Sequence, residues 1–425
     1  MNRIVSMVVV ILLLPLLSSS KNLLIEGSIK NQKTNEKIAY ANVAISGTYI
    51  GTVSNLNGEF RLVVPESLSN KSISFSAIGY ESFSKPINEF VGRVTISLQP
   101  LDYQLGEVVV MPDSTLLTLL RKAYKKIPDN YPDYPTRSIG FYREYLKLKD
   151  SDFLYLSEAI LDVYKTSYEN SIDGQVKLLK SRKSVTSGSD TINRYQFYGG
   201  IYFPHKADIV KRRFDVLKPS KEYNYSLKKV DTYNGHEVYC ISFSPDDDTK
   251  AGLVGEFYLD KESLAYIRFE YCYNDKKLAE SDNDKLFNDL KTIENKKIRI
   301  YERINGRYYF KSGFSKELFL NKGSNKLFEI SDEYILTELD VDSVRQIPFG
   351  EQAPYSTVIS DVAQDYSLSD WKDYTILENE SISQSLFIKK EQADSLLIRE
   401  DLPSKRDFFD KLFKYIDLLE TDITL

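Results

Sequence analysis

The sequence predicts a mainly β protein, in which a small N-terminal β-sandwich is followed by a larger curved antiparallel sheet domain with a few helices. Apolar residues alternate with polar residues in many short runs, and this period of two is typical of half-buried strands. Clusters of turn residues separate these runs. Aromatic side chains favour strands, and the chain contains 31 Tyr and 22 Phe residues.

Composition restricts the classes of protein to which this chain can belong. Its 425 residues are enough for two or three domains, and 42% hydrophobic with 28% charged residues indicates a folded chain. The formal net charge is -5. Nucleic-acid binding requires a basic surface, so we expect no nucleic-acid partner.

Residues 1–20 have the pattern of a signal peptide. Arg3 supplies a positive charge, residues 4–17 form an apolar run, and three serines favour cleavage after Ser20. The run is shorter than the roughly 20 residues that a membrane-spanning helix needs. No Cys lies near the cleavage site, and no later stretch is apolar enough to span a bilayer. We therefore expect an exported protein, periplasmic or associated with the outer membrane, without a transmembrane segment in the mature chain.

Residues 21–100 are predicted to form the β-sandwich. Alternating apolar residues predict short strands at residues 25–29, 43–45, 60–64, 73–75 and 94–98. Asn57 and Gly58 predict a tight turn, because both residue types adopt positive φ at low cost. Several short strands at this spacing favour a small sandwich.

The sandwich segment also carries recognisable motifs. They read G-x-I, A-N-V-x-I-x-G-T, G-T-V-S-N-x-N-G-E-F and S-x-I-G-Y-E. This pattern resembles the carboxypeptidase-like regulatory domain that is common in envelope proteins of Bacteroidetes. The resemblance covers about one fifth of the chain. It implies a transthyretin-like accessory module, and it is nearly silent on function.

Residues 101–112 are predicted to be a linker strand. Its E-V-V-V segment resembles the junction before the plug domain of TonB-dependent receptors, but no plug domain follows here. A helix is then predicted at residues 113–127, where apolar residues recur at intervals of three and four. Asp113 or Ser114 is expected to cap this helix, and Pro128 is expected to end it.

Residues 113–380 are predicted to form the larger β domain. A long hairpin is expected at residues 140–149 and 153–166, and a short basic strand at 175–183. An antiparallel meander is expected at residues 222–227, 237–243, 255–260, 264–273, 296–304, 307–314, 316–319 and 326–336. The pair Asn305-Gly306 predicts one of its hairpin turns.

Two resemblances concern this larger domain. The meander is similar in pattern to the curved sheets of bacterial lipoprotein carriers. The segments G-F-Y-R-E, L-S-E-A, L-L-K-S-R-K-S, I-N-G-R-Y-Y and D-W-K-D-Y resemble the region that follows the sandwich in a Bacteroidetes family of unknown function. Neither resemblance implies an activity.

Residues 381–425 are predicted to be a helical tail. Ser404 and Asp407 form a helix-start pattern. One apolar stripe is expected, formed by Phe409, Leu412, Phe413, Ile416 and Leu419. Such a stripe usually packs on its own domain; a membrane surface or a partner groove is the alternative.

The two histidines are the obvious candidates for metal ligands. His205, Asp208 and His236 imitate a zinc set of two histidines and a carboxylate. A metallocarboxypeptidase would also need a carboxylate base, a substrate-binding arginine and an α/β catalytic domain, which a β meander does not supply. We expect two surface histidines, no metal and no cofactor.

No catalytic residues are predicted. The sequence contains no G-x-S-x-G, no H-E-x-x-H and no phosphate-binding glycine loop. A pair of carboxylates would suit a glycosidase, but 61 acidic residues leave such a pair unlocated.

Clusters of like charge are expected to be solvated. The acidic turns are Asp246-Asp247-Asp248 and Asp282-x-Asp284, with calcium binding as the alternative. The basic clusters are residues 180–183 and 211–213, with contact to an anionic lipid or polysaccharide as the alternative.

Cys240 and Cys272 are predicted to be free thiols, although export would permit a disulfide. They lie in the first and third of three consecutive strands. In a simple meander they would be about 9.5 Å apart, at about 4.8 Å per strand. A disulfide requires Cα atoms within about 7 Å.

The leading hypothesis is a non-catalytic exported envelope protein that binds a partner protein, a glycan or an apolar, lipid-like ligand. A hydrolase acting on envelope peptide or glycan is one alternative, and an accessory subunit of an outer-membrane receptor complex is another. Converging carboxylates in a cleft would favour the hydrolase. A filled, apolar sheet face would oppose it.

Overall fold

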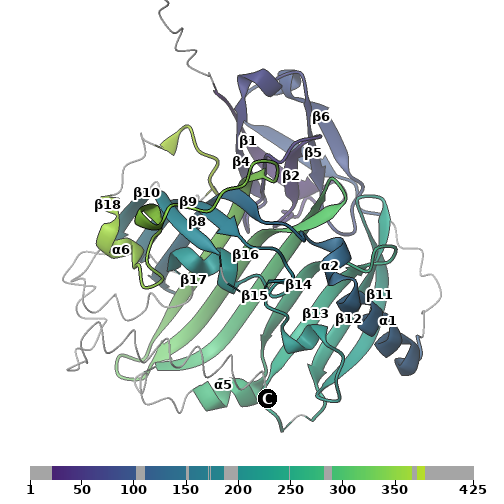
Figure 1. Cartoon of the computed structure of the whole chain (residues 1–425). Coiled ribbons are helices and arrows are strands. Elements are labelled where there is room, and N and C mark those ends of the chain that lie inside the picture. The colour runs from purple at the N-terminus through teal and green to yellow at the C-terminus, as the bar shows by residue number, and fades with distance from the viewer. Residues whose placement is uncertain are drawn as a thin grey trace, which may run out of the picture.

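A computed structural model describes residues 22–101, 111–149, 153–170, 172, 174–185, 200–247, 249–281, 290–365 and 371–378. The predicted signal peptide, most of the linker strand and the predicted C-terminal helix lie outside these residues. The described chain is mainly β, as predicted, with a sandwich at the top of Figure 1 and one large curved sheet below it. None of the described helices is long and apolar enough to cross a membrane.

The sandwich consists of two small sheets around an apolar core. Their strand orders are β4-β1-β7 and β3-β2-β5-β6. The elements are β1 (Asn22–Asn31), β2 (Asn42–Ile45), β3 (Gly51–Val53), β4 (Glu59–Pro65), η1 (Glu66–Leu68), β5 (Ser72–Ser76), β6 (Phe83–Pro86), η2 (Ile87–Glu89) and β7 (Val94–Leu98). Ile29, Val43, Phe60 and Phe75 lie in a core that belongs to the sandwich alone. Gly58 has φ 72° in the predicted turn.

The large sheet has the order β11-β12-β13-β14-β15-β16-β17-β8-β9-β10-β18. Only β18 pairs in parallel with its neighbour. The strands are β8 (Thr136–Leu148), β9 (Phe153–Lys165), β10 (Gln175–Val185), β11 (Tyr223–Tyr233), β12 (His236–Pro245), β13 (Leu253–Asp260), β14 (Tyr266–Tyr273), β15 (Leu290–Ile304), β16 (Arg307–Asn321), β17 (Lys326–Asp340) and β18 (Gln364–Asp365). The predicted hairpin and meander are both present, and pairing of β17 with β8 joins them into one sheet.

The strand order confirms the prediction for the cysteines. Cys240 on β12 is opposite Tyr258 on β13, and Cys272 on β14 is opposite Val254 on β13. One whole strand therefore separates the two sulfur atoms, and both cysteines are free.

One predicted boundary inside the meander was wrong. Residues 307–314 and 316–319 belong to the single strand β16, whose pairing with β17 continues through Ser315. The small polar Ser315 interrupts the apolar pattern without interrupting the backbone ladder. The Asn305-Gly306 turn is present, with φ 49° and 87° at its two residues, values that suit a tight hairpin turn.

The predicted leading helix ends earlier than expected and starts without a side-chain cap. It is α1 (Asp113–Lys125), and its N-cap residue is Pro112. Pro128 does not end it, because Pro128 lies in the first turn of a second short helix, α2 (Ile127–Asn130). Proline is tolerated there, since its missing N–H would have no partner in a first turn.

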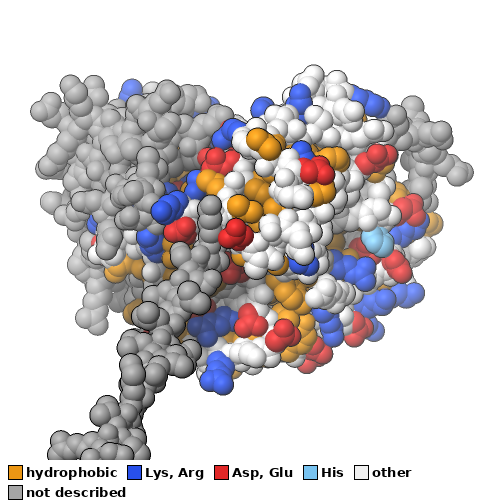
Figure 2. Space-filling view, turned by 90° about the horizontal axis from the view of Figure 1, so that it is seen from above, with side chains coloured by type: hydrophobic (Ala, Val, Ile, Leu, Met, Phe, Trp, Pro, Cys, Tyr) orange, Lys and Arg blue, Asp and Glu red, His pale blue; other side chains and the backbone are white. Residues whose placement is uncertain are grey.

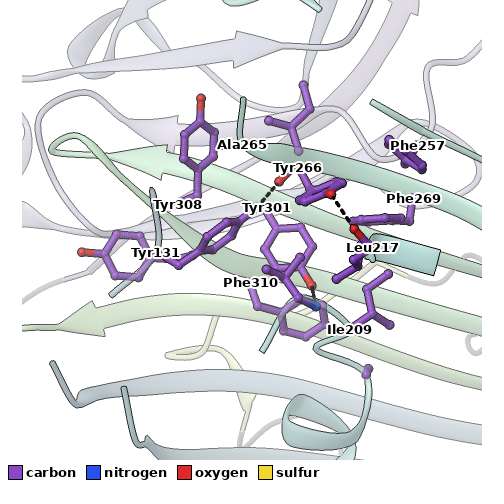
Figure 3. Packing of buried hydrophobic residues seen from close by; sticks show 14 of the residues in the cluster. Tyr131, Ile209, Leu217, Phe257, Ala265, Tyr266, Phe269, Tyr301, Tyr308 and Phe310 are labelled. Atoms are coloured by element: carbon purple, nitrogen blue, oxygen red, sulfur yellow. Dashed lines mark hydrogen bonds between the residues drawn. The ribbon is translucent and has the colours of Figure 1, made fainter. Parts of the chain in front are cut away.

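Helices and loops cover one half of one face of the large sheet. We call this cover the plug; it consists of α1, α2 and residues 200–217, which include η4 (Gly200–Tyr202), α4 (Phe203–Lys206) and η5 (Asp215–Leu217). We call the sheet face beneath it the plug face. Figure 3 shows its aromatic core, where the Tyr131 hydroxyl donates to the Tyr266 carbonyl at 2.6 Å and the Tyr266 hydroxyl to the Leu217 carbonyl at 3.2 Å.

The opposite face of the sheet, the sandwich face, contacts the sandwich and residues 371–378, which we call the strap. Val53 of β3 and Trp371 of the strap share a core with Phe141 and Phe314 of the sheet. Small elements complete the described chain, namely α5 (Asp275–Ser281), η6 (Phe349–Glu351) and α6 (Ile359–Val362).

Polar contacts join the sandwich to the larger domain. Asn42 Nδ2 donates to Glu302 Oε1 at 2.6 Å, and the Val63 N–H donates to Thr375 Oγ1 of the strap at 3.0 Å. The sandwich is therefore held by one buried contact to the sheet and one to the strap.

Candidate functional site

Beyond the plug, the plug face carries a row of mainly polar side chains. Strand register places one side chain from each of six neighbouring strands in a single row, and these are Tyr271, Lys297, Ser315, Asp332, Glu144 and Ser157. In a strand, alternate side chains share a face, so the flanking positions two residues away point the same way.

The flanking positions widen this row into a polar belt. We define the belt by ten residues, which are Tyr142, Glu144, Tyr155, Ser157, Asn295, Lys297, Arg299, Ser315, Glu317 and Asp332. All except the half-buried Lys297 are buried. The plug ends beside the belt, because Phe203 lies over Gly313 and packs against Tyr142. A β-carbon at Gly313 would lie 3.0 Å from the Phe203 ring, so glycine lets the plug approach the strand.

Tyr142 links two carboxyl groups of the belt. Its hydroxyl oxygen lies 2.8 Å from Glu144 Oε2 and 2.6 Å from Asp332 Oδ1. A tyrosine hydroxyl has one hydrogen and donates to one carboxylate only. The other contact is a hydrogen bond only when that carboxyl is protonated and donates to the Tyr142 oxygen. The two acids therefore share a proton through Tyr142, while the Tyr155 hydroxyl donates to Glu144 Oε1 at 2.5 Å.

Burial raises the pKa of every carboxyl group in the belt. Desolvation raises the pKa of Glu144 from 4.5 to about 7, although hydrogen bonds from two tyrosines oppose the rise. Desolvation, followed by the charge of Glu144, raises the pKa of Asp332. Desolvation also raises the pKa of Glu317, against the charge of Lys297. With a pKa of about 7, Glu144 holds a proton at pH values where surface carboxyls are ionised.

The two basic residues of the belt are bound to neutral partners. Arg299 donates to the carbonyl oxygens of Ile298 at 2.9 Å and Phe314 at 2.7 Å, and to Ser315 Oγ at 3.0 Å. Lys297 Nζ donates to the Tyr273 hydroxyl at 3.2 Å. The positive charges of Lys297 and Arg299 also attract the belt acids, but the hydrogen bonds of both bases go to neutral groups.

Three buried atoms of the belt have no hydrogen-bond partner in the described structure. They are Ser157 Oγ, Arg299 Nε and Asn295 Nδ2. Ser157 is directly opposite Glu144, and Asn295 is directly opposite Glu317. Buried polar groups without partners are rare, because each costs desolvation free energy. The belt thus has unused hydrogen-bonding capacity beside two acids that share a proton.

The buried acid of the plug is in the opposite situation. Asp208 accepts hydrogen bonds from Lys165 Nζ at 2.6 Å, from the hydroxyls of Tyr168 at 2.7 Å and Tyr301 at 2.9 Å, and from the Lys211 N–H at 3.2 Å. Burial alone would raise the pKa of Asp208, but the Lys165 charge and these hydrogen bonds outweigh it and lower the pKa. Asp208 anchors the plug and has no spare oxygen for a metal.

The prediction of two surface histidines was wrong for His205. Its side chain lies in α4 with only 1% of the residue exposed, because the plug inserts this segment against the sheet. Burial, followed by the charge of Lys165, lowers the pKa of His205 to about 3, so the ring is neutral. His236 lies at the surface, as expected, 3.7 Å from Glu262. Within the described residues, no group of three His, Cys, Asp or Glu side chains is placed to hold a metal ion.

The prediction that the basic clusters are solvated was wrong for two of their residues. Lys211 is buried, and its Nζ donates to Thr166, Ser167 and Asn170 at 2.8 Å each. Arg182 is also buried, because it forms an ion pair with Glu158 at 2.5 Å on the sandwich face. Folding places these long side chains over loops and carboxylates that are distant in sequence.

The acidic turns behave as predicted where they are described. Asp246 pairs with Lys250 at 2.8 Å, and Asp247 accepts hydrogen bonds from Thr249. Asp248, Asp282 and Asp284 lie outside the described residues. On the molecular face in Figure 2, basic and acidic side chains are interspersed, which is typical of a solvated surface.

Sequence reasoning did not find the polar belt. A signal was present in Y-R-E-Y and S-D-E-Y, where charged residues occupy both alternating phases of a strand. A strand with one solvated face needs charges in only one phase. Charges in both phases indicate that polar side chains lie on a buried face.

Comparisons with known proteins agree with the predicted sandwich. The CarboxypepD_reg-like domain family matches residues 25–110, which confirms the regulatory domain. No curated protein matches the sequence.

Solved structures match the larger domain with low scores. A structure from Vibrio parahaemolyticus, described as an outer membrane lipoprotein-sorting protein domain, is 12% identical. The match covers 54% of this chain and 93% of that chain, with a TM-score of 0.25. A DUF1329 family protein from Desulfovibrio piger is 12% identical, with coverages of 55% and 95% and a TM-score of 0.25. A LolA superfamily protein from Nitrosomonas europaea is 12% identical, with coverages of 53% and 94% and a TM-score of 0.21. Scores this low support no functional conclusion.

Proposed function

We propose that this protein is an exported, non-catalytic binding protein of the cell envelope, and that its ligand or partner is bound at the polar belt. One observation carries the proposal: Ser157 Oγ, Arg299 Nε and Asn295 Nδ2 are buried on one face without partners. A bound molecule that supplies these partners would offset the desolvation free energy of the three atoms.

The same geometry argues against the hydrolase alternative. Glycosidases separate the pKa values of two carboxyls, so that one is ionised while the other holds a proton. In the belt, burial raises the pKa of both Glu144 and Asp332. Tyr142 also occupies the position between the two acids, where a reacting bond would have to lie. Neither acid is free to act as a nucleophile.

Native mass spectrometry of the full chain purified from envelope extract tests the proposal. We expect the wild type to carry a non-covalent ligand and Ser157→Val to lose it, because valine removes the hydroxyl and adds bulk at the belt. Ser312→Val is the matched control, since Ser312 is equally buried and unpartnered but lies on the sandwich face. Equal ligand occupancy in the wild type and Ser157→Val would overturn a belt site.

A further inference from the structure

We propose that the belt binds a neutral, hydroxyl-rich group, such as one sugar unit of a glycan. This inference rests on the proposed function, and it names the ligand class that the belt recognises. It follows from the charge balance of the belt and from the types of atom that lack partners.

The charges of the belt cancel. Its acids are Glu144, Glu317 and Asp332, and its bases are Lys297 and Arg299. The Tyr142 hydroxyl touches two of the acids with one hydrogen, so one of those acids keeps a proton. Two negative charges then face two positive charges. Lys183 continues the row opposite Ser157 on β10, but it is half-buried and has a partner of its own.

An ionised ligand does not suit a balanced, buried site. An added phosphate, carboxylate or ammonium group would leave one net charge inside the protein, and such a charge costs several kcal/mol unless it is paired. The charge of Lys297 attracts Glu317, and the charge of Arg299 attracts Asp332. Glu144 and Asp332 are also occupied with each other through Tyr142. The belt therefore has no free counter-charge for an ion.

A purely apolar ligand does not suit the belt either. Arg299 Nε and Asn295 Nδ2 are donors without acceptors, and Ser157 Oγ both donates and accepts. An alkyl chain would cover these atoms and leave them unpaired. A hydroxyl group accepts from the two nitrogen donors and pairs with Ser157 or a carboxyl oxygen. A molecule with several hydroxyls matches this mixture without adding charge.

Calorimetric titration of the full chain tests the ligand class. The probes are neutral tetrasaccharides of glucose, mannose and galactose, their uronic-acid and amino-sugar counterparts, and laurate. We expect at least one neutral sugar to bind, and its charged counterparts to bind at least tenfold more weakly. Ser157→Val should weaken the affinity for the neutral sugar at least tenfold, and Ser312→Val should change that affinity less than twofold.

Other outcomes separate this inference from the proposed function. If a charged sugar or laurate binds best and Ser157→Val abolishes that binding, the belt is a binding site but the neutral-ligand inference is wrong. If a probe binds and Ser157→Val leaves it unchanged, both proposals fail. If no neutral sugar binds, the inference is likewise overturned. Thermal unfolding of Ser157→Val shows whether the variant is folded before any titration.

Discussion

The apolar half and the polar half of the plug face share several strands, yet their side chains are paired in different ways. One half is apolar, and the plug fills it with aromatic side chains (Figure 3). The other half is the polar belt, where buried atoms remain without partners. The contrast is clearest for the acids, because the plug pairs both oxygens of Asp208, whereas two belt acids share one hydroxyl.

Asp208 and Asp332 show this difference at the level of one residue type. Both are buried, and desolvation acts on both. Asp208 receives four hydrogen bonds, one of them from a charged lysine, and its pKa is lowered. Asp332 shares one hydroxyl with a second acid, and its pKa is raised. Donor supply, rather than burial, decides whether a buried carboxyl keeps its charge.

The largest expected effect is at the anchor of the plug. Asp208→Asn removes the negative charge and leaves Lys165 buried without its partner, so unfolding should require about 3 to 5 kcal/mol less free energy. Urea unfolding followed by fluorescence measures this loss. Asp246→Asn is the control, because its surface pair with Lys250 should contribute at most about 1 kcal/mol. A loss below 1 kcal/mol for Asp208→Asn would show that the plug is not held in this way.

The next effect is the pH dependence that the belt confers. Glu144 has a folded pKa of about 7 against 4.5 when unfolded, so its stabilising contribution is complete below pH 4.5 and is lost as pH rises through 7. The loss is on the order of 3 kcal/mol. Glu144→Gln mimics the protonated acid, so this variant should show a flatter stability profile between pH 5 and pH 8.

Urea unfolding at one-unit pH intervals measures these profiles. Asp332 titrates in the same direction, so a residual slope is expected in Glu144→Gln. Glu237→Gln should keep the wild-type profile, since the ion pair of Glu237 with Lys261 lies at the protein surface. Parallel profiles for Glu144→Gln and the wild type would contradict the assignment of the shared proton.

A smaller effect is expected from a hydroxyl in the plug. The Tyr301 hydroxyl donates to Asp208 at 2.9 Å and accepts from the Val210 N–H at 3.2 Å. Tyr301→Phe leaves that N–H buried and unpaired, which should cost about 1 to 3 kcal/mol in urea unfolding. An unchanged midpoint would mean that solvent reaches the plug and replaces the hydroxyl.

The smallest effect is expected from a hydroxyl in the belt. Ser157 Oγ has no partner, so Ser157→Ala should change the free energy of unfolding by less than about 0.5 kcal/mol in the ligand-free protein. Measured beside Tyr301→Phe, this variant compares a paired hydroxyl with an unpaired one. A loss above 1 kcal/mol would show that Ser157 is paired and that the belt has less unused capacity.

Local patterns in the sequence predicted most of the elements. Alternating apolar residues located the strands, and the Asn305-Gly306 pair located a hairpin turn, because both signals depend on neighbouring residues alone. The short spacing of three consecutive strands was enough to keep Cys240 and Cys272 apart. The end of α1 and the continuity of β16 differ from the prediction, because Pro128 fits the first turn of α2 and Ser315 keeps its place in the backbone ladder.

The belt could not be predicted in the same way. Glu144 and Asp332 are far apart in the chain, and they meet only because β17 pairs with β8 in one particular register. A shift of one residue in that register would turn one of them to the sandwich face. Nothing near either residue in sequence specifies its partner.

The sequence by itself determined the sandwich, the antiparallel meander and the free cysteines, because these follow from side-chain alternation and short connections. Only the tertiary structure decided which charges are buried. It placed His205 and Lys211 inside the plug, and it brought the belt acids together around Tyr142. The physical reason is that burial and pairing depend on contacts between distant segments, and a pattern of neighbouring residues does not contain those contacts.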